Sequence, residues 1–178
     1  VQAFLKSMKA DLYKVEYKTQ KEYEAYIYGS ADVVGLMCLK VFVNGDDAKY
    51  EQLKEPAMRL GSAFQKVNFL RDLKDDFETL ERSYFPNLNL KDFNNQAKRE
   101  IIKEIEEDFD VAFTDGVLKL PVEAQFGVYV AYRYYRRLLK KINNTPSSEI
   151  LETRIRISNP MKINLLARSF VKYKLNLI

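Results

Sequence analysis

Four polar side chains recur along one segment at spacings of three, four and four residues: Gln65, Asn68, Asp72 and Asp76. On an α-helix, with about 100° per residue, these positions fall within roughly a quarter of the circumference and form one ridge. Asp72 and Asp76 then have Cβ atoms about 5–6 Å apart, which suits two carboxylates that bind one divalent ion or flank a pair of ions. Such oxygen ligands are those that Mg²⁺ prefers. The ridge therefore predicts a metal-binding helix face.

A solvated helix face is the alternative explanation of a polar ridge. Solvated faces usually interleave Lys with acidic residues four positions apart, because such pairs stabilise a helix slightly. This ridge carries no Lys or Arg: Lys66 and Lys74 project elsewhere, and Arg71 lies on one flank. Two carboxylates four residues apart cost a few tenths of a kcal/mol unless a cation offsets them. Taken alone, the residues leave both interpretations open. The opposite side of the helix carries the apolar packing residues Ala63, Val67, Leu70, Leu73 and Phe77.

The ridge is part of a longer pattern that starts at Gly61 and ends at Pro86. It reads Gly-x-x-x-Gln-x-x-Asn-Phe-x-Arg-Asp-Leu-x-x-Asp, then five residues, then Arg-x-Tyr-x-Pro. This pattern resembles the second signature of the squalene and phytoene synthases, the head-to-head prenyl-transferring enzymes. The first signature of that family is matched at Tyr26, Ser30, Ala31, Val34, Gly35 and Cys38. The chain departs from it at Ile27 and Asp32, where small residues are usual.

The resemblance implies an activity. It is closest to bacterial phytoene synthases, so the expected reaction joins two geranylgeranyl diphosphates head to head into phytoene, a step of carotenoid biosynthesis that releases diphosphate. Mg²⁺ is the expected cofactor, with Mn²⁺ as a substitute, and no NADPH is expected. The alternatives are a squalene or dehydrosqualene synthase that uses farnesyl diphosphate, a non-catalytic relative that acts as an assembly factor, and a head-to-tail prenyltransferase or terpene cyclase. Non-catalytic relatives typically lose metal-site acids, whereas Asp72 and Asp76 are both present.

The resemblance also assigns roles to the ridge and its surroundings. It implies that Asp72, Asp76 and Asn68 bind the metal. The residues expected to hold the substrate diphosphate are Gln65, Asn68, Arg71, Arg82, Tyr135 and Arg154, with Tyr132 and Tyr134 as rivals of Tyr135. Tyr26 is expected to face the reacting carbons, where its ring stabilises a carbocation by cation–π attraction. The residues expected to line an apolar tunnel for the prenyl tail are Val33, Leu36, Phe64, Val67 and Phe69.

Composition and periodicity favour an all-α protein of 178 residues with only six Gly and five Pro. Together with the resemblance, this predicts an antiparallel helical bundle of the isoprenoid (terpenoid) synthase type. One Cys excludes an internal disulfide, and the absence of His excludes His-based triads and His-ligated zinc sites within the chain. The chain opens at Val1 without a capping signal and has no Asp-x-x-x-Asp before Tyr26. We therefore expect residues 1–178 to be the C-terminal two thirds of one domain, incomplete at the N-terminus and inactive in isolation.

Local signals divide the chain into helices. Thr19 and Glu22 form a capping box at the start of a helix over about 20–43, and Asn44-Gly45 ends it. Pro56 is expected to begin or kink the next helix, which ends near Leu80. Further helices are expected at about 95–113 and 121–143. A turn at 145–148 precedes a short helix or turn, and a last helix begins near Pro160. Residues 82–94 form a loop that either folds over the acidic helix or simply connects its neighbours.

The C-terminal region is basic. From Arg133 onward only Glu149 and Glu152 oppose a long series of Lys and Arg. An ordinary basic solvent face and docking on an anionic membrane surface both explain this bias; nucleic acid is not expected as a partner, because no recognisable binding module is present. No uninterrupted apolar run approaches the ~20 residues that span a bilayer. The expected location is the cytoplasm, with peripheral contact to the inner membrane face through the C-terminal helices.

Overall fold

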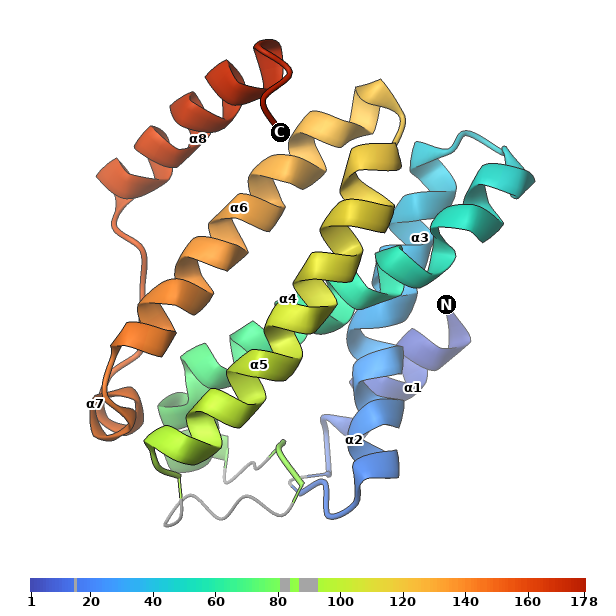
Figure 1. The fold of residues 1–178 in the computed structure, drawn as a ribbon. Coiled ribbons are helices and arrows are strands. Elements are labelled where there is room, and N and C mark those ends of the chain that lie inside the picture. Colours follow the sequence, from blue (N-terminus) through green and yellow to red (C-terminus); the bar gives the residue numbers. More distant parts are fainter. Residues whose placement is uncertain (15, 81–83, 87–92) are drawn as a thin grey trace.

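The structure is a computed structural model that describes residues 1–14, 16–80, 84–86 and 93–178, with only the backbone path for 76–80. It is an all-helical bundle, as predicted (Figure 1). The helices are α1 (Gln2–Ala10), α2 (Gln20–Ile27), α3 (Val33–Phe42), α4 (Asp47–Leu80), α5 (Asn95–Val111), α6 (Val122–Asn144), α7 (Ser147–Glu152) and α8 (Asn159–Lys174). Short π- and 3₁₀-helical turns, η1 (Tyr28–Asp32), η3 (Ala112–Gly116) and η4 (Val117–Lys119), join some of them. Consecutive long helices such as α5 and α6 run in opposite directions (Figure 1).

The helix predicted over 20–43 is present, but it contains a π-helical turn. The capping box is confirmed, since the Thr19 side chain accepts a hydrogen bond from the Glu22 backbone N–H. The Glu22 side chain in turn accepts one from the Thr19 backbone N–H. The π turn η1 joins α2 to α3 and falls within the first signature. Asn44 and Gly45 end α3 with φ values of 48° and 86°, the left-handed conformation expected at a helix C-terminus. π turns inside helices are frequent at functional sites.

The central helix, α4, begins earlier than its sequence indicates. It starts at Asp47 and encloses Pro56, so Pro56 does not begin this helix. The alternative expectation, that Pro56 kinks the helix, stays a prediction. Its apolar side is packed as expected, because Ala63, Val67 and Leu70 are completely buried. Helix α4 contacts α3, α5, α6, α7, η1 and η3, and each side of it therefore has a different environment.

Two glycines allow α3 and α4 to approach each other closely. A Cβ atom on Gly35 would lie 2.6 Å from the Ala57 carbonyl oxygen of α4. A Cβ atom on Gly61 would lie 2.7 Å from the Ala31 carbonyl oxygen. Both distances are shorter than real Cβ contacts, so any side chain at either position forces the helices apart. The small residues shared by the two signatures thus set the spacing of these helices.

One continuous helix, Gln20–Phe42, is long and apolar enough by length and composition to cross a membrane. In the structure it packs against α1 and α4. Near its middle, Asp32 accepts a hydrogen bond of 2.6 Å from Ser62 Oγ of α4. A third of its apolar window is buried, and these contacts join the helix to the rest of the bundle.

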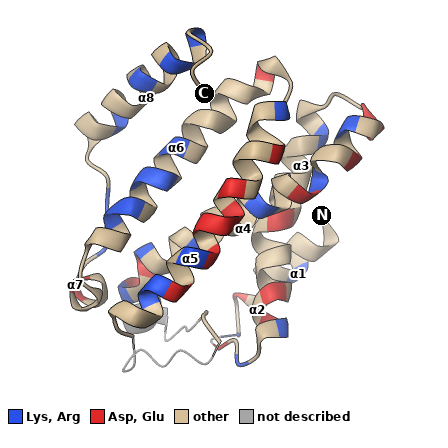
Figure 2. Cartoon of the chain, in the orientation of Figure 1, with Lys and Arg blue, Asp and Glu red and all other residues tan. Residues whose placement is uncertain are grey.

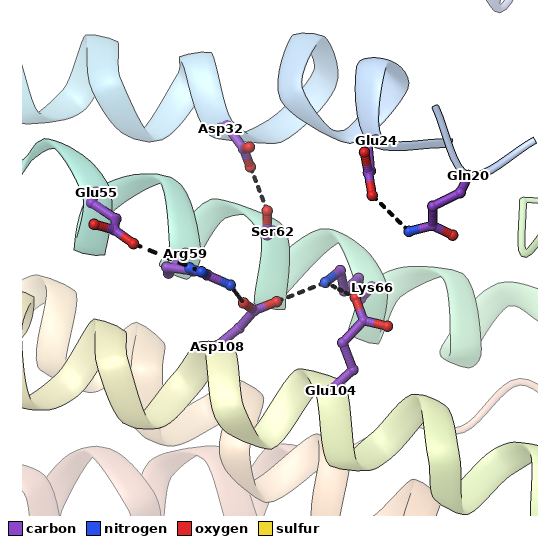
Figure 3. Close-up of polar contacts among 9 residues, drawn as sticks. All are labelled: Gln20, Glu24, Asp32, Glu55, Arg59, Ser62, Lys66, Glu104 and Asp108. Atoms are coloured by element: carbon purple, nitrogen blue, oxygen red, sulfur yellow. Dashed lines mark hydrogen bonds and ion pairs between the residues drawn. The ribbon is translucent and has the colours of Figure 1, made fainter. Parts of the chain in front are cut away.

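A network of charged residues joins α4 to α5, and Ser62 of α4 reaches Asp32 on the neighbouring helix (Figure 3). Asp108 is almost completely buried and accepts hydrogen bonds from Lys66 Nζ at 2.7 Å and from Arg59 at 2.9 Å. Lys66 also pairs with Glu104. Burial alone would lower the pKa of Lys66, but its hydrogen bonds with Asp108 and Glu104 outweigh burial and the pKa is raised. Each buried charge in this network therefore has an opposite partner.

Asp32 gives a pH-dependent prediction. Burial raises its pKa above the usual 3.8, although Ser62, Lys66 and Arg59 counteract burial, while Asp108 adds to it. The folded state therefore binds this proton more tightly than the unfolded chain, and stability falls as pH rises from about 3.8 through the raised pKa. Asp32→Asn keeps an oxygen for Ser62 and removes the charge. We expect the variant to have a higher Tm than wild type at pH 7, and this difference in Tm to shrink towards pH 4. A difference in Tm that does not change with pH would contradict this account.

Candidate functional site

Asp72 is held by two arginines from different parts of the chain. Arg154, in the segment between α7 and α8, places Nε 2.6 Å from Asp72 Oδ1. Arg71, the preceding residue of α4, donates from Nε to the same carboxylate at 3.0 and 3.1 Å and adds a contact from its terminal nitrogen. Asp72 is half-buried, with 19% of its side chain exposed. The hydrogen bond with Asp72 raises the pKa of Arg71 despite burial, so two fixed positive charges flank this acid.

Tyr135 of α6 completes the polar cluster. Its hydroxyl donates a hydrogen bond of 3.3 Å to Asn68 Oδ1, one turn before Asp72 on α4. Its ring stacks on Phe64 with centroids 4.0 Å apart. Of the three candidate tyrosines, Tyr135 thus reaches the ridge, while Tyr132 stacks on Phe113 at 4.7 Å. Asn68, Arg71, Asp72, Tyr135 and Arg154, which we call the polar cluster, were all predicted site residues.

An apolar cavity of about 590 Å³ begins beside the polar cluster. Gln65, the first residue of the ridge, and Phe64, the stacking partner of Tyr135, both line it. The cavity continues between α3, α4 and α6 towards Phe42 and Leu53, near the turn that joins α3 to α4. Along α4, the 12 residues from Leu53 to Gln65 span about 18 Å at a rise of 1.5 Å per residue. The arrangement therefore offers an anion-binding end and a long apolar end.

Most of the residues predicted to line a prenyl tunnel lie outside this cavity. Of the five residues proposed for the tunnel, only Phe64 lines the cavity. Val33, Val67 and Phe69 are buried in helix packing, and Leu36 is half-buried outside the lining. The sequence reasoning missed the wall contributed by α6, where Ala124, Gly127, Val128 and Ala131 face the cavity. Small residues at spacings of three and four on an otherwise bulky helix were the available signal.

Tyr26 lies in a separate aromatic group. Its ring packs against Tyr17 and Tyr84 with centroid separations of 4.7 and 5.5 Å, and its hydroxyl donates to Asp11 Oδ1 at 2.9 Å. Burial, aided by Tyr84 and Asp11, raises its pKa strongly, so the phenol remains neutral. Tyr26 does not line the cavity. Its predicted role at the reacting carbons stays a prediction, and the bond with Asp11 was not anticipated.

Two predicted site residues cannot be placed. Arg82 lies outside the described residues, and so does the side chain of Asp76, whose backbone continues α4 one turn beyond Asp72. Within the described part of the chain, no group of three or more acidic, Cys or His side chains is arranged to hold a metal ion. Asp72 and Asn68 nevertheless provide hard oxygen donors, and Mg²⁺ commonly uses one or two carboxylates together with substrate phosphates. These residues thus fit a magnesium site that the substrate completes.

The sequence profile of the family described as "Squalene/phytoene synthase" matches residues 1–160. The chain belongs to this family. Among curated proteins, 15-cis-phytoene synthase from Enterobacter agglomerans is 29% identical over 172 residues, which cover 88% of this chain and 56% of the relative. The 15-cis-phytoene synthase of Pantoea ananas is 27% identical over 176 residues, which cover 91% of this chain and 55% of the relative. The chain therefore spans about half the length of the curated relatives it matches.

Solved structures show the same fold. A dehydrosqualene synthase in complex with a ligand superimposes with a TM-score of 0.74 at 21% identity, over 97% of this chain and 64% of that one. The squalene synthase HpnC from Alicyclobacillus acidocaldarius gives a TM-score of 0.55 at 17% identity, over 98% of this chain and 58% of that one. At these identities the likeness supports the terpenoid-synthase helical fold and leaves the substrate open.

Proposed function

We propose that the full-length protein is a Mg²⁺-dependent prenyltransferase that condenses two prenyl diphosphates head to head. The observation that carries this proposal is the contact between the polar cluster and the wall of the apolar cavity, made where the ring of Tyr135 stacks on Phe64. Gln65 and Phe64 belong to the cavity wall, Tyr135 stacks on Phe64, and Asn68 accepts a hydrogen bond from Tyr135. Asp72 follows Asn68 one turn later on α4. A prenyl diphosphate has the same two-part chemistry, with a charged head and a long hydrocarbon tail.

Each residue of the polar cluster has a role in this proposal. Arg71 and Arg154 bind diphosphate oxygens, because guanidinium groups recognise phosphate through paired hydrogen bonds. Asp72 and Asn68, with Asp76 of the same ridge, hold Mg²⁺, which neutralises the leaving diphosphate when bound. Tyr135 holds the Asn68 amide in position through its hydrogen bond. Gln65 lies where the head group meets the tail.

The cavity determines where the prenyl chain lies. Its volume of about 590 Å³ falls within the range typical of small-molecule sites, and most of its lining is apolar. Burying a hydrocarbon chain there contributes about 0.8 kcal/mol per methylene group. The lining also excludes water from the region around the reacting carbons, which protects a carbocation from premature capture.

Geranylgeranyl diphosphate is the proposed substrate and phytoene the proposed product. This choice is supported by the phytoene synthases among the curated relatives and by the form of the first signature. The structural similarity to dehydrosqualene and squalene synthases keeps farnesyl diphosphate as the second candidate. The proposed reaction to phytoene uses no NADPH, whereas squalene formation does.

Product analysis tests this proposal. The full-length protein is incubated with Mg²⁺ and either farnesyl or geranylgeranyl diphosphate, with and without NADPH, and the lipid products are identified by mass spectrometry. We expect phytoene from the C20 substrate without NADPH. A C30 product alone would support the second candidate, and no product from either substrate would favour a non-catalytic relative. Residues 1–178 alone are expected to give no product, because they contain a single Asp-x-x-x-Asp pair, Asp72 and Asp76.

Arg154 should affect metal and diphosphate binding in opposite directions. Its guanidinium group pairs with Asp72, with Nε 2.6 Å from Oδ1. Arg154→Ala removes a charged hydrogen-bonding group worth about 1.5–3 kcal/mol, so pyrophosphate binding in the presence of Mg²⁺ should weaken about 10–100-fold. Because Asp72 then has one positive neighbour fewer, Mg²⁺ alone should bind more tightly. Calorimetry measures both affinities, and the exposed Arg156→Ala serves as control. Weaker Mg²⁺ binding without pyrophosphate would contradict this account.

A further inference from the structure

Helix α8 lies at the edge of the bundle beside α6 (Figure 1). It packs through a narrow stripe in which Leu165 and Ser169 are buried. Arg133 of α6 donates to Ser169 Oγ at 3.0 Å, and the Tyr173 hydroxyl donates to the Val122 carbonyl at 3.3 Å. These contacts fix the rotation of α8 about its own axis, and with it the identity of its outward face.

The outward face of α8 is apolar. Ile163 is 69% exposed, and Leu166 and Val171 are exposed as well. Phe170 is 50% exposed and lies at the edge of this face, where its ring packs edge-on against Phe126 of α6 at a centroid separation of 5.9 Å. At about 100° per residue these four side chains lie within one arc, largely opposite the buried stripe of Leu165 and Ser169. A contiguous exposed apolar face of this kind marks an interaction site more often than a solvated surface.

The surroundings of this face are strongly basic. From Thr153 to Ile178 the chain has no Asp or Glu, and its charged residues are Arg154, Arg156, Lys162, Arg168, Lys172 and Lys174. Two adjoining grooves of about 510 and 490 Å³ between α6 and α8 carry basic side chains, and no acidic residue of the described chain lines either groove. Figure 2 shows the basic residues along α6 and α8 and the acidic ones concentrated on α2, α4 and α5. The partner of this surface should therefore be anionic.

We propose that α8 docks on an anionic lipid bilayer, with its apolar face in the interfacial region and the lysines that flank this face near lipid phosphates. Ile163, Leu166 and Phe170 supply the apolar insertion, and Lys162 and Lys174 extend their ammonium groups to the head groups along apolar stems. Each Lys or Arg near an anionic leaflet contributes about 1 kcal/mol. A nucleic acid would satisfy the charges but leave the apolar face exposed to water. The cytoplasmic leaflet carries the required negative charge.

Vesicle co-sedimentation of the full-length protein tests this proposal. Vesicles of phosphatidylcholine alone are compared with vesicles containing 30% phosphatidylglycerol, about a third of the lipid and enough for an anionic surface. We expect binding to the anionic vesicles only, weakened by added salt. The double variant Ile163→Ser/Leu166→Ser should lose at least tenfold in binding, because it removes two exposed anchors. Val41→Ser, which alters an exposed apolar residue of α3, should bind as wild type.

The Tm of the same variants separates the proposal from its main rival, in which another part of the full-length protein covers α8. If the face is free, Ile163→Ser/Leu166→Ser keeps the wild-type Tm while losing vesicle binding. A Tm lowered by several degrees would show that the face is an internal interface and would overturn the proposal. Equal binding to neutral and anionic vesicles, or binding to a single-stranded oligonucleotide without binding to vesicles, would overturn it as well.

Discussion

Asp72→Asn is expected to reduce product formation from prenyl diphosphate by a factor of about 10²–10³. The substitution keeps the size of the side chain but removes the charge through which Asp72 would hold Mg²⁺. Its carboxylate is flanked by Arg71 and Arg154, so the variant also leaves two guanidinium groups without their anion. These groups are partly exposed, and water replaces the lost contacts at small cost. The loss should therefore appear in turnover and leave the Tm nearly unchanged.

Asp75→Asn is the matched control for this experiment. Asp75 lies three residues further along α4, and its side chain is exposed to solvent. It carries the same charge as Asp72 but lies outside the polar cluster. Turnover of the control should stay within twofold of wild type. An Asp72→Asn variant that is as active as the control would show that Asp72 has no part in metal binding.

Gly127→Leu is expected to block the cavity without harming the fold. A Cβ atom at Gly127 would meet no other atom within 4 Å, and the residue lines the cavity. Leucine is a better helix former than glycine by roughly 0.8–1 kcal/mol, so α6 should become more stable. Its side chain would displace about four methylene groups of a prenyl tail, worth about 0.8 kcal/mol each. We expect substrate affinity to fall by about 100-fold while the Tm rises.

Gly127→Ala is the companion variant, since it gains most of the helix propensity with little added bulk. It should raise the Tm similarly and bind prenyl diphosphate almost as wild type does. Binding is measured by calorimetry with a non-hydrolysable prenyl thiodiphosphate, and pyrophosphate alone serves as a tail-free reference. If Gly127→Leu weakened pyrophosphate and the prenyl compound equally, the cavity would not be the site of the tail.

The polar cluster was largely predictable from the sequence. Spacing alone placed Asn68 and Asp72 on one helix face, because helical periodicity fixes which residues share a side. The family resemblance supplied Tyr135 and Arg154, which lie more than 60 residues after this helix face in the sequence. In the structure they contact Asn68 and Asp72, respectively. Local patterns do not encode such long-range contacts, and only the tertiary fold brings them together.

The cavity was not predictable in the same way. Its lining depends on which side of each helix faces a neighbour, and α4 is surrounded on several sides. Val67 and Phe69 are apolar and close to the ridge, yet they pack in the core, whereas Gly127 and Ala131 of α6 form the wall. The start of α4 was also misjudged, because Pro56 was given more weight as a helix signal than tertiary packing allows. The buried pair Lys66–Asp108 joins positions 42 residues apart and left no local signal.

A crystal structure of the full-length protein with Mg²⁺ and geranylgeranyl thiodiphosphate tests the central claim most directly. We predict the diphosphate between Arg71, Arg154 and Asp72, with metal density beside Asp72 and the prenyl chain running past Gln65 into the cavity between α3, α4 and α6. Metal and diphosphate bound elsewhere, with Asp72 still paired to both arginines and the cavity free of the prenyl chain, would contradict the account.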